Sequence, residues 1–217
     1  MRAIIFNLTA HTLLPLNYAL AKFLSTDIPI FQIIWARHFF TIILILPIIY
    51  IFFKEKFVWT EKPGLQILRG LLLLAVNIFF YYAVSQISLV KALTLAFVSP
   101  LVVTIFSSIL LYERVGIRRW SAVIIGFFGA LVVLRPGYIP LEMGSISALC
   151  AGTTYAFYLI LTRKLSASDN SLLTLLITGI VGTFGMSLTV PFFWVVPTLE
   201  QWFLLSLIGI TTVLGHF

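Results

Sequence analysis

Long and nearly uninterrupted apolar runs are the feature that most constrains how this chain can fold. Hydrophobic residues make up 61% of the 217 positions and charged residues 10%, so a water-soluble domain would have too few polar side chains to cover its surface. Lipid offers no hydrogen bonds to the backbone, and a spanning segment must therefore be a helix or part of a closed barrel. Because strand-like alternation is absent from these runs, the sequence predicts an all-α integral membrane protein.

Stretches of roughly 20 apolar residues predict the individual spans. They are joined by short connections, which favour an antiparallel transmembrane helix bundle. The expected spans are residues 4–23, 29–53, 65–87, 92–112, 118–134, 143–162 and 172–195. An eighth begins near Trp202 and has no room to finish before Phe217, so we expect the chain to stop inside a span.

The lysines and arginines predict the orientation of the bundle. Ten of the 14 fall on one side of the expected spans, three fall on the other, and Arg37 lies inside a span. This asymmetry predicts a multi-pass protein with a cytoplasmic N-terminus, and the membrane that we expect it to cross is a bacterial inner membrane. The net charge of +7 forms no continuous patch, so nucleic acid is not an expected partner, and a single cysteine, Cys150, excludes an intrachain disulfide.

Arg37 and His38 are the strongest candidates for a binding role, because a charged side chain inside lipid costs roughly 2.5–3.5 kcal/mol on insertion scales. Arg37 lies about 12 Å along its helix from Pro29 at 1.5 Å per residue. It could pair with a carboxylate or phosphate of a substrate, or extend to the outer interface with its charged end in water. His38 could titrate near neutral pH or be a hydrogen-bonded structural residue.

Polar residues in the first, third and sixth spans predict a polar cavity, with contacts between helices as the alternative explanation. The candidates are His11, Asn17 and Tyr18 in the first span, Asn77 and Tyr81 in the third, and Thr154 and Tyr158 in the sixth. Pro15 and Pro100 are expected to kink their helices, and Pro15 beside Asn17 could expose carbonyl groups to such a cavity.

Charges at the ends of the fourth span are either gates or solvated boundary residues. Lys91 opens this span on the outer side, and Glu113 and Arg114 close it on the inner side. In the seventh span, Gly179, Gly182 and Gly185 recur every third residue, which favours close helix approach. No metal-binding, cofactor-binding or catalytic motif is present, so we expect neither an enzyme nor a bound cofactor or metal.

Two short segments suggest an internal repeat. Residues 22–27 (KFLSTD) and 164–169 (KLSASD) each follow a span that opens one half of the chain, at an offset of 142 residues. Five spans separate them, so the second copy would be inverted in the membrane.

Residues 83–137 resemble the end of the first EamA repeat of the drug/metabolite transporter superfamily. The resemblance is carried by Ala83 with Ile87, Ser99-Pro100-Leu101, Leu111-Tyr112-Glu113-Arg114, Gly126 with Gly129, and Arg37 in the second span. Residues 135–137 (RPG) are similar to the subgroup that contains riboflavin and S-adenosylmethionine-type uptake carriers. The resemblance implies ten spans, both termini cytoplasmic, an inverted five-plus-five architecture and a central site. Residues 1–137 would form the first repeat, and residues 138–217 would begin the second.

The expected function is secondary, ATP-independent transport of a small metabolite by alternating access, with an anionic metabolite among the candidates. The alternatives are a non-transporting membrane subunit and an inactive truncated fragment of such a carrier. The lipid bilayer is an expected partner, and a homodimer is left open.

Overall fold

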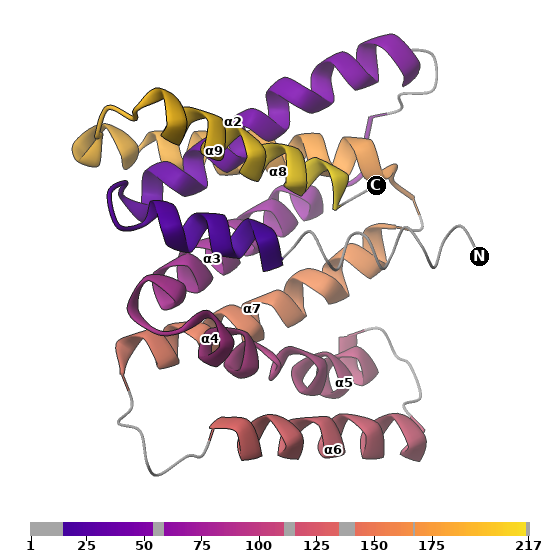
Figure 1. Cartoon of the computed structure of the whole chain (residues 1–217). Helices are drawn as coiled ribbons and strands as arrows, with labels where there is room; N and C mark the ends of the chain where they lie inside the picture. The colour runs from indigo at the N-terminus through magenta and orange to yellow at the C-terminus, as the bar shows by residue number, and fades with distance from the viewer. Residues whose placement is uncertain (1–14, 54–58, 111–115, 135–141, 167, 216–217) are drawn as a thin grey trace. The chain divides into compact units, whose positions relative to one another are not determined.

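A computed structural model of the chain describes residues 15–53, 59–110, 116–134, 142–166 and 168–215, and these residues form helices and no strand (Figure 1). The first described helix comprises residues 15–24. The others are α2 (Ile30–Ile48), α3 (Pro63–Gln86), α4 (Leu89–Ala96), α5 (Ser99–Leu110), α6 (Ile117–Leu134), α7 (Met143–Leu165), α8 (Ser171–Ser187) and α9 (Leu199–Leu214), with a π-helical turn at Ile49–Phe53 and a 3-10 turn at Val190–Phe193.

Several of these helical segments have the length and composition of membrane spans. Within the described residues, four are long and apolar enough to cross a bilayer, at Ile30–Ile51, Pro63–Gln86, Leu89–Leu110 and Met143–Leu165. Shorter apolar helical segments occupy Trp120–Gly129, Ser171–Ser187 and Leu199–Leu214. The predicted all-α membrane fold is confirmed.

The chain divides into two compact units, and the first combines its two ends, Met1–Leu74 and Ser168–Phe217. Here α2 packs along α8 and α9 (Figure 1). The α8 glycines permit the close approach that the sequence predicted, because a Cβ at Gly179 would lie 2.8 Å from Ile42 and one at Gly185 would lie 2.7 Å from Leu74. An apolar core at one end of these helices contains Ile45, Ile49, Leu172, Leu175, Leu176 and Val213.

The second unit is continuous in sequence, Ala75–Ala167, and in it α4 and α5 pack on α7 and contact α6. The predicted span 92–112 consists of two helices, interrupted at residues 97–98, close to Pro100, where the sequence predicted a kink. Pro100 explains the break, since its ring clashes with the carbonyl four residues earlier, and α4 ends at that residue, Ala96. Gly152 of α7 meets the broken end, where a Cβ would lie 2.7 Å from the Ala96 carbonyl oxygen.

The last two predicted spans also have different limits. The range 172–195 is wrong beyond Ser187, because α8 ends there, four residues before Pro191, and an apolar connection follows. The eighth span begins earlier than Trp202. Its helix, α9, starts at Leu199, where the Thr198 side chain accepts a hydrogen bond from the Gln201 backbone N–H and the Gln201 side chain accepts one from the Thr198 N–H.

Candidate functional site

Arg37 and His38 are buried in the first unit, each with 3% of its surface exposed. Their helix, α2, continues through both residues, and the Arg37 carbonyl accepts a hydrogen bond from Thr41 Oγ1 at 2.8 Å. The imidazole of His38 packs against the backbone of Gly182, where any Cβ would overlap its ring. Arg37 is thus enclosed by protein, whereas a side chain reaching for the interface would be exposed.

A second guanidinium, that of Arg69, is also buried in this unit, with 5% exposure. Its Nη1 donates to Thr178 Oγ1 at 2.8 Å and to the Thr174 carbonyl at 3.4 Å, so it is directed from α3 towards α8. In the sequence, Arg69 is one of the ten basic residues on the predicted cytoplasmic side, and it was not among the predicted binding residues. Its place six residues after Pro63, about 9 Å along the helix, was the signal that could have identified it.

Both arginine-bearing helices contact the same stretch of α8. Arg69 bonds Thr178, and at the next residue, Gly179, a Cβ would lie 3.5 Å from the His38 carbonyl. Among the described residues, the buried charged side chains are Arg37 and Arg69, and no carboxylate is buried. His38, which follows Arg37 in α2, is a buried side chain that can be titrated. Guanidinium groups present a planar set of donors that matches a carboxylate or phosphate, so this layer of the unit is suited to an anionic group.

A polar network lies nearer the start of α8 and is centred on Asp169. Its carboxylate accepts hydrogen bonds from Thr60 Oγ1 at 2.7 Å and from Gln66 Nε2 at 2.5 Å. Partial burial alone would raise the pKa of Asp169, but hydrogen bonds from Thr60, Gln66 and Ser168 and the charge of Lys62 outweigh it and lower the pKa below its usual value of 3.8. The network therefore joins the start of α3 to the start of α8 through an ionised carboxylate.

In the first helix, Asn17 is almost completely buried and makes a helix contact. Its Nδ2 lies 2.9 Å from the Ile208 carbonyl, 3.0 Å from Thr211 Oγ1 and 3.1 Å from Thr212 Oγ1, all in α9. Tyr18 is half-buried, Pro15 is exposed, and His11 lies outside the described residues.

The candidates in α3 and α7 lie within the second unit. Asn77 and Tyr81 are buried in α3. In α7, the buried Tyr158 ring stacks on Tyr155 with centroids 5.6 Å apart, and Thr154 is half-buried.

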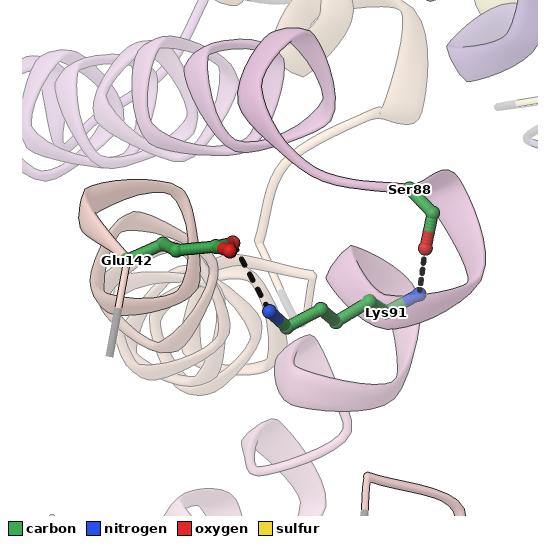
Figure 2. A network of polar contacts seen from close by, with 3 residues as sticks. All are labelled: Ser88, Lys91 and Glu142. Carbon is green, nitrogen blue, oxygen red and sulfur yellow. Dashed lines mark hydrogen bonds and ion pairs between the residues drawn. The ribbon is translucent and has the colours of Figure 1, made fainter. Parts of the chain in front are cut away.

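Lys91 forms an ion pair that the sequence did not predict. Its Nζ lies 3.1 Å from Glu142 Oε2, joining the first turn of α4 to the residue that precedes α7, while the Lys91 backbone N–H donates to Ser88 Oγ (Figure 2). Glu113 and Arg114 lie outside the described residues. Among the described residues, no cluster of His, Cys, Asp or Glu is suited to a metal ion.

Comparison with known proteins gives a consistent result. The chain is 26% identical over 193 residues to an S-adenosylmethionine uptake transporter of Rickettsia bellii, covering 89% of this chain and 66% of that protein. It is 25% identical over 222 residues to a riboflavin transporter of Vibrio cholerae, covering 100% of this chain and 74% of that protein. It is 28% identical over 205 residues to a pseudopaline exporter of Pseudomonas aeruginosa, covering 91% of this chain and 70% of that protein.

The chain thus spans less than two thirds of the length of the S-adenosylmethionine transporter it matches. Its fold resembles that of a solved crystal structure with a TM-score of 0.71 and 18% identity, covering 98% of this chain and 76% of the other. The model of the EamA-like transporter family matches residues 1–135, which is more than half of the chain. The chain belongs to the EamA-like transporter family.

Proposed function

We propose that this protein is a secondary transporter of a small metabolite that works by alternating access. Membership of the EamA-like family supports this proposal, as do the names of three relatives, which are transporters of S-adenosylmethionine, riboflavin and pseudopaline. Two of these relatives are described as an uptake transporter and an exporter, so the comparison favours neither direction.

The main observation in favour of a substrate site in the first unit is the burial of two guanidinium groups. Both belong to helices that contact the same stretch of α8. Arg37 and Arg69 place two positive charges inside the first unit, where the low dielectric strengthens their attraction for an anion. We infer that they orient a carboxylate or phosphate of the transported metabolite. Two polar residues of the same unit, the buried His38 and the half-buried Tyr18, would complete its binding site.

Alternating access would involve two inverted repeats, and the lengths of two turns support that organisation. Five residues, 25–29, separate the first described helix from α2, and five residues, 166–170, separate α7 from α8. The paired segments KFLSTD (residues 22–27) and KLSASD (residues 164–169) each run from the end of the preceding helix into one of these turns. Equal connections at corresponding positions are expected of two copies of one structural unit.

We propose that the N-terminus lies on the cytoplasmic side of a bacterial inner membrane. The orientation is argued from the ten-to-three distribution of basic residues. Single cysteines at Lys62, Arg118 and Ser168, introduced in a Cys150→Ser background, would test it. All three should resist a membrane-impermeant thiol reagent applied to intact cells and react after permeabilisation. Reaction in intact cells would refute the orientation.

Transport and the anion site can be tested together with the protein expressed from its complete gene and reconstituted in vesicles. The assay would compare S-adenosylmethionine, riboflavin, pseudopaline and simple carboxylate and phosphate metabolites. Arg37→Lys and Arg69→Lys keep the charge but lose the planar donor set, so transport of an anionic metabolite should fall by about tenfold or more for a lost charge-assisted hydrogen bond.

Arg118→Lys is the matched control, because Arg118 is an exposed arginine at the start of α6 and should tolerate the change. Failure of the unmodified protein to move any of these compounds would contradict the proposed function. Normal transport by both buried-site variants would leave transport standing and remove the arginines from the substrate site.

A further inference from the structure

The connection between α8 and α9 is unusually apolar for a segment outside a helix. Most of its large side chains are exposed rather than packed into the unit, as in Leu188 (76% exposed), Phe192 (82%) and Val196 (80%), although Val190 is buried. Exposed apolar surface of this extent is normal where the solvent is hydrocarbon and unfavourable in water. The connection therefore has the surface of a segment that contacts lipid.

The backbone of this connection is hydrogen-bonded by a side chain from α2. Gln32, which is buried, donates from Nε2 to the Val195 carbonyl at 2.8 Å and accepts at Oε1 from the Val195 N–H at 3.0 Å. One amide side chain thereby satisfies both polar groups of one residue, as a neighbouring strand would. Backbone polar groups that are shielded from water need such partners.

Beside this connection is an open groove of about 470 Å³, lined by Trp35, Ser187, Val190, Pro191 and Trp194. The rings of Trp35 and Trp194 stand at 83° with centroids 5.8 Å apart, so they form two walls at nearly a right angle. The one side chain in this lining with a polar oxygen is Ser187, and its hydroxyl accepts a hydrogen bond from Trp35 Nε1 at 3.0 Å.

We propose that this groove binds the acyl chain of a membrane phospholipid. It is continuous with the exposed apolar side chains of the α8–α9 connection, which a bilayer would cover, and its volume falls within the 300–1,000 Å³ of small-molecule pockets. None of its lining side chains is charged, so it offers no counterion to a metabolite, whereas a hydrocarbon chain needs none. The proposal is independent of transport.

The test measures fluorescence of a variant that keeps both groove tryptophans, Trp35 and Trp194, and has phenylalanine at the other three. The detergent-purified protein is titrated with acyl-brominated phosphatidylethanolamine. Quenching should saturate at a low molar ratio of lipid to protein, as expected for one site. A variant that keeps Trp120 alone, at the start of α6, should show quenching that rises without saturation.

Two substitutions at Ser187 separate filling of the groove from loss of the hydrogen bond. Ser187→Leu fills the groove and should abolish the saturable quenching of the two groove tryptophans. Ser187→Ala removes the same hydrogen bond without adding bulk and should keep the saturable quenching, with thermal unfolding of both variants confirming the fold.

Three outcomes would overturn the proposal. Quenching of the two groove tryptophans that never saturates would mean contact with bulk lipid only. Equal quenching in the two Ser187 variants would show that the groove is not the site. Release of the bound lipid by a water-soluble metabolite would assign the groove to that metabolite.

Discussion

The close approach of Gly152 to the broken fourth span leads to a quantitative prediction for Gly152→Ala. A Cβ would lie 2.7 Å from the Ala96 carbonyl oxygen and 3.0 Å from its Cα, and ordinary contact begins near 3.4 Å. Backbone atoms cannot rotate away, so α7 must withdraw by about 0.7 Å, and overpacking of this kind costs about 1–3 kcal/mol. Alanine regains about 1 kcal/mol of helix propensity, so the net loss is about 0–2 kcal/mol, and the loss relative to a glycine-to-alanine change in open space is about 1–3 kcal/mol.

The measurement is reversible unfolding in mixed micelles of increasing dodecyl sulfate content, followed by circular dichroism. Gly126→Ala is the control, because Gly126 lies inside α6 and a Cβ there would meet nothing within 4 Å. It should unfold at the same or a higher detergent fraction than the unmodified protein. If Gly152→Ala proved as stable as Gly126→Ala, the proposed contact between α7 and the end of α4 would be refuted.

Three further predictions concern other contacts. Gly182→Ala should also destabilise the protein by about 1–3 kcal/mol, because its Cβ would overlap the His38 ring, and the same unfolding assay would measure it. Asp169→Asn should lower stability at neutral pH. Because the pKa of Asp169 is lower in the folded protein than in the unfolded chain, the ionised carboxylate stabilises the fold at pH values above 3.8. This stabilisation is lost as the pH falls below 3.8 through the native pKa, so the unfolding curves of the unmodified protein and of Asp169→Asn should converge in acid. A stability difference that is the same at every pH would contradict the assignment. For Lys91 and Glu142, whose side chains are 17% and 47% exposed, a double-mutant cycle should give about 0.2–1 kcal/mol, decreasing with salt; a larger, salt-independent coupling would exclude a solvent-screened pair.

The sequence was sufficient for the fold class, because hydropathy reports directly on the solvent that a helix faces. It was less informative about where helices break inside apolar runs. Two helices end four residues before a proline, α4 before Pro100 and α8 before Pro191, yet α2 continues past Pro47 to Ile48. A proline removes one backbone donor everywhere, and only the surrounding packing decides whether the helix stops.

The candidate site was predictable in part, for a related reason. Arg37 was a candidate because it lies deep within a predicted span. Arg69 also lies within a predicted span, but the lysines that precede it in the sequence led to its being grouped with the boundary charges. The partners were not predictable, since Thr178 is 109 residues from Arg69 and Glu142 is 51 residues from Lys91. Neither pair has a spacing that a helical period could reveal.

The hydrogen bonds of Asn17 have a consequence for how the protein is made. Their acceptors in α9 are encoded at least 191 residues later, which at about 5–20 residues per second is a delay of roughly 10–40 s during synthesis. The second unit is continuous in sequence and can assemble as soon as it is translated, whereas the first unit must wait for its other half. Until α9 is made, we expect the Asn17 amide to bond to other groups, such as water, lipid headgroups or the insertion machinery. Crosslinks from this position on ribosome-bound chains of increasing length should pass from those partners to α9 only once α9 has emerged.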